Sequence, residues 1–517
     1  MNRYLLKNII LFSFVVILLS PGCSSASGDS GNKATKTAKI GPLPGSTNVR
    51  AIKPNYQSRA ENPTCPKLAP PKMEGTRILV DISGSMRGFT GKHATFQLIH
   101  NAINDSVARI GAQKKIERCL VGDSFDHCKN NIKNLAKFNR TKFYKGNSQL
   151  HLALVPPPLL DGCQQVDPME TAEINLMITD GVQVAGNRSV AQGETSEIAC
   201  INGTDPHCLK TVLIERIRQG FGVWISFGYL PFKGLHFPER PLRKQDWKLI
   251  EQHLNELRVD PLFENVVKFK AKKPRLPSKA TKGFRFSGVK PLIFIVFTKD
   301  IQKGRKFVKV LDETFKREKI FLPHDTFFSM ELAPLNLPRY SISKVSRGKP
   351  SNVKGDDNKF GQSEDFKIMP SNAIDPKIFP LHTKCEIRNG AWMTAYLDKT
   401  GGENYPWLTQ SLELYPYKYN LPSNIFWGWK TLGNKALLSG IKCMNMPEGK
   451  FKHTWILQTK NKIKVEKDLW WAEYSSENSF EKPERVYGLK YLISGILDAT
   501  LSKPKQMQYL TWTMERE

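Results

Sequence analysis

Between residues 76 and 318, short continuous apolar runs alternate with segments of helical spacing, and this alternation is the strongest constraint on the fold. The runs are uninterrupted, which is typical of strands in a parallel sheet whose two faces are both covered. We therefore predict an α/β domain over 75–318 with a doubly wound, mostly parallel sheet. The expected strands are 77–82, 116–125, 173–181, 222–230 and 291–298, and the expected helices are 96–111, 208–219, 245–257 and 300–316.

The chain changes character after about residue 334. It becomes rich in tryptophan, and its apolar runs are broken by Gly, Pro and Asn. Residues 454–460 and 468–474 indicate strands, and 486–497 indicate a helix. We predict a smaller β-rich or α+β C-terminal domain over 335–517. Its tryptophans suit a carbohydrate-stacking platform, but Trp470 and Trp471 in a strand are more often core residues.

The first residues have the pattern of an export signal. Arg3 and Lys7 precede an apolar segment, Ile9 to Leu19, that is too short for a membrane-spanning helix. The segment ends in LLSPGC, which resembles the lipobox of bacterial lipoproteins, with Pro21 as a departure from it. The resemblance implies cleavage before Cys23 and acylation of that residue, palmitate included. The alternative is an ordinary signal peptide with a chance cysteine.

These features predict a lipoprotein signal peptide over 1–22 and a flexible tether, rich in Ser, Gly, Lys, Thr and Pro, over 23–74. The folded part is then outside the cytoplasm, held at the cell envelope by lipid. Ser24 after the modified cysteine resembles sorting to the outer membrane in a Gram-negative cell.

The remaining cysteines also favour export. Nine cysteines less Cys23 leave eight, an even number that indicates up to four disulfides in an exported chain. Their spacing does not give the pairing, although proximity favours Cys200 with Cys208. A zinc site is disfavoured because no CxxC is present. The candidates are Cys65, Cys119, Cys128, Cys163, Cys200, Cys208, Cys385 and Cys443.

Polar residues follow two of the predicted strands, as DISGS (81–85) and TDG (179–181). Since ligands of α/β sheets bind beyond the carboxyl ends of the strands, both sequences are expected at one edge, where they can meet. The pattern DxSxS, with Asp81, Ser83 and Ser85, resembles the first loop of the metal-ion-dependent adhesion site in the von Willebrand factor A (vWA) family. Asp180 resembles the aspartate of that family's third loop.

The vWA resemblance covers about 75–318 and implies a second loop that supplies a threonine after glycine. Here KGNSQ places Ser148 at that position, with Thr141 or Ser124 as alternatives. The resemblance implies a magnesium site, or calcium or manganese, formed by Asp81, Ser83, Ser85, Ser148 and Asp180. Hydroxyl ligands and few direct carboxylates suit a hard, electrophilic cation with an open position. The competing interpretation is a polar turn with no ligand.

Charge bears on partners. The net charge of +29 favours acidic partners or anionic surfaces. A basic insertion at about 260–290 has nine Lys or Arg and no acid within 268–290, interleaved with Phe269, Phe284 and Phe286. In an exported protein this segment suits an anionic envelope polymer or lipid, and no nucleic acid is expected. The alternative is a solvated loop.

These observations predict a lipid-anchored protein, not an enzyme, whose vWA domain binds a protein partner that offers a carboxylate to the metal. No sequence signature of a hydrolase or nucleotide-binding enzyme is present. The rival interpretations are an envelope enzyme, with acids such as Asp398, Glu403 and Glu413 in the C-terminal part, and a structural assembly subunit. In both, the vWA domain is only a docking module.

Overall fold

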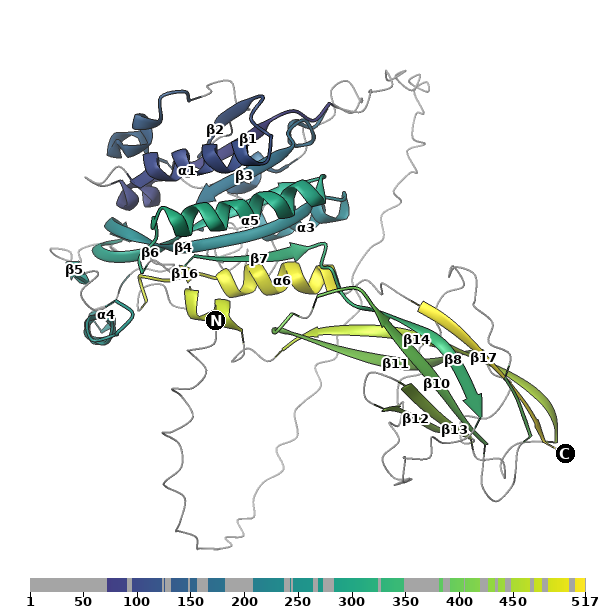
Figure 1. The fold of residues 1–517 in the computed structure, drawn as a ribbon. Helices are drawn as coiled ribbons and strands as arrows, with labels where there is room; N and C mark the ends of the chain where they lie inside the picture. The colour runs from purple at the N-terminus through teal and green to yellow at the C-terminus, as the bar shows by residue number, and fades with distance from the viewer. Residues whose placement is uncertain are drawn as a thin grey trace, which may run out of the picture. The chain divides into compact units, whose positions relative to one another are not determined.

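The computed structural model describes most of the chain after residue 71 (Figure 1). Contacts divide the chain into two units, Met1–Asn62 and Pro63–Glu517, and all described residues belong to the second. The described ranges are 72–90, 95–122, 125, 132–146, 149–155, 166–181, 208–236, 242, 245–263, 268–272, 283–323, 327–347, 381–384, 391–403, 405–418, 426–432, 436–441, 448–464, 469–476, 482–501 and 507–516.

A mixed sheet forms the centre of an α/β fold (Figure 1). Its strand order is β2-β1-β3-β6-β4-β7, and β5 pairs with β6 at the side. The five strands predicted for residues 75–318 are all present, and β4 and β6 extend well beyond their predicted bounds. The strands are β1 (Thr76–Asp81), β2 (Ile116–Val121), β3 (Ile174–Thr179), β4 (Gly222–His236), β5 (Lys270–Lys272), β6 (Phe284–Thr298) and β7 (Phe328–Ala333).

Three of these strands are parallel neighbours. β1 lies between β2 and β3, with Val80 opposite Ile178 in the register. Every residue of β1 and β3 is buried. Their uninterrupted apolar sequences fit this position, because both faces of these strands pack against other elements.

The sheet is mixed and mostly parallel, since β4 points the same way as β1, β2 and β3, whereas β6, which lies between β3 and β4, points the opposite way. β6 is antiparallel to both β3 and β4, and β7 is antiparallel to β4. The end of β4 at His236 lies opposite the start of β6 at Phe284. The connection therefore returns the chain beside the strand it has just left, as in a hairpin. A crossover to the far end of the sheet would be needed for parallel pairing.

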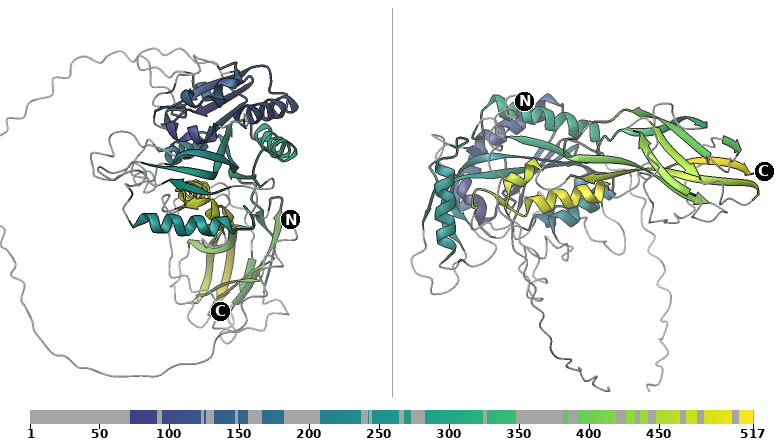
Figure 2. Two further views of the ribbon diagram at one scale, coloured as in Figure 1. Left: turned by 90° about the vertical axis from the view of Figure 1, so that its left-hand side faces the viewer. Right: turned by 90° about the horizontal axis from the view of Figure 1, so that it is seen from below.

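Helices cover both faces of the sheet (Figures 1 and 2). On one face α1 packs against α5, and Trp224 of β4 lies against Gly304 of α5. On the other face α3 packs against α6, and Phe227 of β4 meets Tyr474. The α-helices are α1 (Thr95–Arg109), α3 (Leu209–Arg218), α4 (Asp246–Arg258), α5 (Ile301–Arg317) and α6 (Leu489–Leu501); the 3-10 helices are η1 (Gly84–Phe89), η2 (Leu135–Asn139), η3 (Thr141–Phe143), η4 (Leu150–Ala153), η5 (Pro168–Glu170) and η11 (Trp470–Tyr474).

The C-terminal part supplies two four-stranded sheets, with orders β12-β13-β10-β8 and β11-β14-β17-β9. A two-stranded parallel pair joins β15 to β16. The strands are β8 (Arg339–Arg347), β9 (Leu381–Lys384), β10 (Ala391–Thr400), β11 (Leu408–Lys418), β12 (Phe426–Leu432), β13 (Ala436–Ile441), β14 (Gly449–Ile463), β15 (Ser475–Ser476), β16 (Val486–Tyr487) and β17 (Met507–Arg516).

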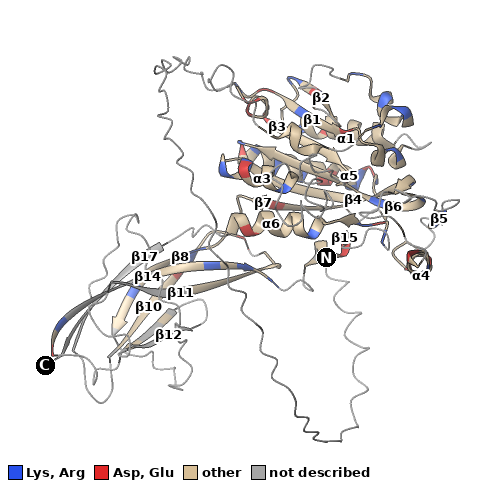
Figure 3. Cartoon of the chain, turned by 180° about the vertical axis from the view of Figure 1, so that it is seen from behind, with Lys and Arg blue, Asp and Glu red and all other residues tan. Residues whose placement is uncertain are grey.

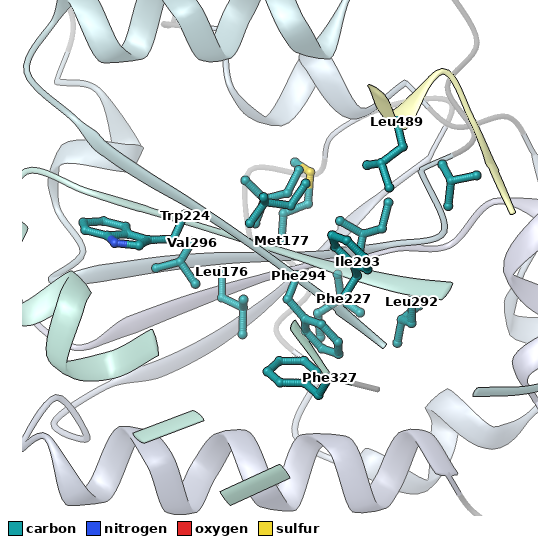
Figure 4. Packing of buried hydrophobic residues seen from close by; sticks show 14 of the residues in the cluster. Leu176, Met177, Trp224, Phe227, Leu292, Ile293, Phe294, Val296, Phe327 and Leu489 are labelled. Atoms are coloured by element: carbon teal, nitrogen blue, oxygen red, sulfur yellow. The ribbon is translucent and has the colours of Figure 1, made fainter. Parts of the chain in front are cut away.

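The described residues of the segments 469–476 and 482–501 return to the α/β sheet and complete its core. Trp471, Leu489 and Ile493 belong to the same buried cluster as the sheet strands. Figure 4 shows Leu489 beside Met177 of β3 and Ile293 of β6. The WWAEY segment is a 3-10 helix and not the predicted strand, because Trp471 and Tyr474, three residues apart, both point into this cluster.

Candidate functional site

The ends of β1 and β3 meet at one edge of the sheet, as the two polar sequences predict. Thr179, the last residue of β3, donates a hydrogen bond from Oγ1 to Oδ2 of Asp81, at 2.8 Å. Asp180 follows at once, and its negative charge acts on Asp81. The parallel pairing of β1 with β3 brings these residues together from positions about a hundred apart in the sequence.

The turn after β1 is organised around its own polar groups. The backbone N–H of Ser83 donates to Oδ1 of Asp81 at 2.8 Å, so Asp81 fixes the start of the turn. The hydroxyl oxygens of Ser83 and Ser85 are 2.9 Å apart. η1 begins between them, at Gly84, and carries Ser85 in its first turn.

The segment before Ser148 lies against this turn. The backbone N–H of Gly84 donates to the carbonyl of Gly146 at 3.1 Å, and that of Lys145 donates to Ile82 at 2.8 Å. Ser148 itself lies outside the described residues, as does Ser124. Thr141 is described, and it is exposed in η3, so it does not share the burial of the other candidates.

The site is buried. The exposed fraction is 0% for Asp81, 3% for Ser83, 6% for Ser85 and 3% for Asp180. Burial, and next the negative charge of Asp180, raise the pKa of Asp81 to about 7. The hydrogen bonds from Ser83 and Thr179 oppose this rise. Two carboxyl groups in so dry a place favour either a proton or a cation.

Two elements far apart in the sequence close this region. η1 packs on the outer half of β4, where the rings of Phe89 and Phe232 meet edge to face at 5.1 Å. On the other side, Gly181 has a φ of +77°, and a Cβ there would lie 2.8 Å from Cγ1 of Val486 in β16. The exit of β3 therefore needs glycine both for its backbone and for its contact with the C-terminal segment.

The residues fit a hard divalent cation. Adjacent ligands of an octahedral magnesium ion, at about 2.1 Å from it, are separated by about 3 Å, which matches the distance between the Ser83 and Ser85 hydroxyls. Both oxygens of Asp81 already accept hydrogen bonds, which suits a carboxylate that balances charge from just outside the coordination sphere. Among the described residues, no group of three or more His, Cys, Asp or Glu side chains is placed to hold a metal. The fit therefore depends on the hydroxyls.

The basic segment does not present its aromatic rings to a ligand. Phe269, Phe284 and Phe286 are each 1% exposed and belong to the core. The described lysines of β5 and Arg285 are exposed, whereas Lys290 is buried. Figure 3 marks in blue the Lys and Arg positions along the described chain. Phe284 and Phe286 alternate inward along β6 and leave their basic neighbour Arg285 outside. Binding of an anionic polymer or lipid by the exposed basic residues stays a prediction.

The structure also describes several tryptophans and acidic residues of the C-terminal part. Trp407 and Trp471 are buried and pack edge to face at 5.7 Å, so they are core residues. Asp398 and Glu403 are exposed, and Asp398 and Glu413 lie on strands of different sheets. The side chain of Glu413 lies outside the described residues.

Among the described residues, two cysteines are present, Cys119 and Cys208, and both are buried and disulfide-bonded. The other disulfide candidates and the lipidation candidate lie outside the described residues; they are Cys23, Cys65, Cys128, Cys163, Cys200, Cys385 and Cys443. No helix in the described part of the chain combines the length and apolar character needed to cross a bilayer.

Sequence reasoning missed three residues of this region. Thr179 precedes Asp180 in the TDG sequence and donates a hydrogen bond to Asp81. Its position at the end of a predicted strand was the available signal that it lies at the site. Lys290 is one of the nine basic residues within 268–290, and the apolar strand that follows it directly was the available signal for its burial. Glu484 is 1% exposed and comes from the C-terminal segment, for which no local pattern indicates a return to the sheet.

Neither the family models, nor the curated proteins, nor the solved structures include a match to this chain.

Proposed function

We propose that this chain is a lipid-anchored protein of the cell envelope whose α/β body binds a divalent cation and, through it, a protein partner. The ligands are Asp81, Ser83, Ser85, Ser148 and Asp180, with magnesium, calcium or manganese as the ion. The supporting observation is the convergence of the Asp81 turn and Asp180 at one sheet edge, linked through Thr179. The proposal identifies this part of the chain with a vWA domain.

The vWA identification has its best support around β1, β2 and β3. These strands are parallel, and the two motifs follow β1 and β3 in the order and place that the resemblance requires. A doubly wound sheet would continue in parallel beyond β3, whereas β6 runs antiparallel there. The resemblance therefore applies to the half of the sheet that carries the candidate ligands.

The metal would hold the two loops together and present an electrophilic position to a carboxylate. Asp81 and Asp180 supply negative charge, and the serine hydroxyls supply neutral ligand oxygens. Because these side chains are buried, a partner's carboxylate reaches the metal only when the chain around it opens. Partner binding is then coupled to a local rearrangement, in which the partner favours the open state.

The first experiment is a metal titration of the full chain after treatment with EDTA. Magnesium, manganese or calcium is expected to raise the Tm, since a ligand at a hundred times its Kd stabilises by about 2.7 kcal/mol. Asp81→Ala should abolish this rise. Asp398→Ala is the control, because it removes an exposed acid on β10. An unchanged Tm for the natural chain with all three metals contradicts the proposal.

The second experiment separates adhesion from a purely structural metal. The tagged chain is used to recover partners from envelope extracts, with and without EDTA. Loss of the same partner with EDTA and with Asp81→Ala supports metal-dependent binding. Recovery that neither treatment changes, in a chain that does bind metal, favours the second candidate.

That second candidate is a structural assembly subunit whose metal only stabilises the fold. Its supporting observation is the burial of all four described ligand candidates. A metal enclosed in this way contributes folding free energy and has no direct contact with a partner.

The envelope location rests on the sequence of residues 1–23 and has its own test. Cells expressing the chain are fed labelled palmitate, and the label is expected in the mature protein and absent from Cys23→Ala. A label that persists in Cys23→Ala contradicts lipidation at this residue.

A further inference from the structure

Lys290 lies just beyond the candidate site on the same sheet. The pairing of β3 with β6 ends with Thr179 opposite Ile293. Lys290 precedes Ile293 by three residues in β6 and lies opposite Leu230 of β4. Its side chain is 5% exposed. β6 thus extends past the end of β3 and carries a buried ammonium group to the edge where Asp180 emerges.

The surroundings of Lys290 connect it to the turn that carries the candidate ligands. Its Nζ is 4.8 Å from the centroid of the Phe232 ring. The same ring packs edge to face on Phe89, and a Cβ at Gly88 would collide with it. Phe232 therefore contacts both the ammonium group and η1, the helix that begins within the Asp81 turn.

The charges nearby are those of two acids. Burial lowers the pKa of Lys290, and the negative charges of Asp180 and Glu484 oppose this and favour the ammonium form. Glu484 comes from the segment before α6, is 1% exposed, and accepts a hydrogen bond from His253 on one oxygen. A buried charge is tolerated only where opposite charges compensate it, so Lys290 depends on these acids. Glu484 is also paired with Arg485 at 3.2 Å and with His253.

We propose that Lys290 is an internal cation that competes with the divalent metal at the acidic centre of Asp81 and Asp180. In the metal-free protein its ammonium group balances Asp180. When a metal binds, the ammonium group repels it, which weakens affinity and keeps binding reversible. This inference rests on the proposed metal-binding function and identifies the residue that tunes it.

The test is the manganese affinity of the full chain and its variants, measured by calorimetry and by the shift in Tm. Lys290→Met keeps the length and apolar stem of the side chain and removes the charge. Its Kd for manganese is expected to fall by about tenfold or more, as removal of a unit charge from a poorly solvated site requires. Lys233→Met is the matched control, because it removes the same charge from an exposed position on the adjacent strand β4.

The outcomes separate this inference from the proposed function. A natural chain that binds weakly or not at all, with tight binding only in Lys290→Met, supports the inference. Equal affinity in the natural chain and both variants overturns it and leaves metal binding in place. Binding by none of the three overturns both.

A folding defect is also decisive. If Lys290→Met does not fold, Lys290→Gln is measured against the same criterion. If both neutral variants stay unfolded in saturating manganese, a metal does not replace the charge of Lys290, and the inference fails.

Discussion

Thr179 joins the two strand ends of the candidate site through one hydroxyl group. Its Oγ1 donates to Asp81 at 2.8 Å and also accepts from the backbone N–H of Gly181 at 3.0 Å. The residue itself is fully buried. It therefore orients one carboxylate and anchors the turn that follows the other.

Thr179→Val should destabilise the metal-free protein by about 1–3 kcal/mol, because it removes a buried donor to a carboxylate while keeping the shape of the side chain. The measurement is urea unfolding in EDTA. Thr179→Ser retains the hydroxyl and should lose less. If the valine and serine variants unfold at the same urea concentration, the hydroxyl has no such role.

Gly181 tests how closely the C-terminal segment covers the exit of β3. An added methyl group would meet Ile293 and Val486 at less than 3 Å, and the φ of +77° already disfavours other residues. Gly220 has a φ of +92° with open space around it. Gly181→Ala should therefore cost about 1 kcal/mol more than Gly220→Ala, the difference being overpacking alone. Equal losses of unfolding free energy in the two variants would show that β16 does not press on this turn.

At the scale of elements, the sequence predicted β1, β3 and their polar ends because two local signals agree there. The apolar run specifies a buried strand, and the Asp and Ser that follow specify a turn. Parallel pairing then places Asp81 and Asp180 at one edge. The direction of β6 had no such signal, because residues 291–298 form the same apolar run in a parallel or an antiparallel strand.

The position of residues 469–501 was not predictable for a different reason. Their burial depends on the sheet strands, which lie far away in the sequence, and local periodicity carries no information about such partners. The same limit applies to Lys290, because the basic residues that precede it, Lys282 and Arg285, suggest an exposed segment. Long-range packing decides both cases.

The contact between α4 and the segment before β16 should depend on pH. Nε2 of His253 is 3.0 Å from Glu484, and Nδ1 is 3.4 Å from Glu256. Burial, and to a smaller extent the charge of Arg485, lower the pKa of His253. The hydrogen bonds to Glu484 and Glu256 and the charge of Glu484 outweigh them, so the pKa is raised. The stabilisation is therefore complete below the unfolded pKa of about 6.5 and is lost as the pH rises through the folded value.

Urea unfolding of the natural chain and of His253→Gln between pH 5 and 9 measures this contribution. The pKa of Asp81 is raised to about 7, so its contribution to the unfolding free energy also falls as the pH rises to that value. This contribution is the same in both proteins, so the difference between their unfolding free energies isolates His253. That difference should be largest at low pH and shrink as the pH rises. A difference that is constant or grows with pH contradicts the ion pair.

At the scale of the whole molecule, one core joins distant parts of the chain. The cluster that contains β1 and β3 also contains Trp407, Trp471 and the buried face of α6. The α/β body is therefore incomplete without residues that lie between β14 and β17 in the sequence. Cooperative unfolding is expected to include the sheet and residues 469–501 together.

Ile493→Ala tests this dependence. Ile493 is fully buried in α6, and its truncation should cost about 2–5 kcal/mol through lost burial and the cavity left behind. Hydrogen exchange in β6 and in the Asp81 turn after β1 should accelerate together with exchange in α6, since all three then open with the same reduced free energy. Leu492→Ala, at a half-buried position of the same helix, should give a smaller change. Faster exchange confined to α6 would show instead that the helix unfolds independently of the sheet. The positions of Asp81 and Asp180 would then not depend on packing of the C-terminal part.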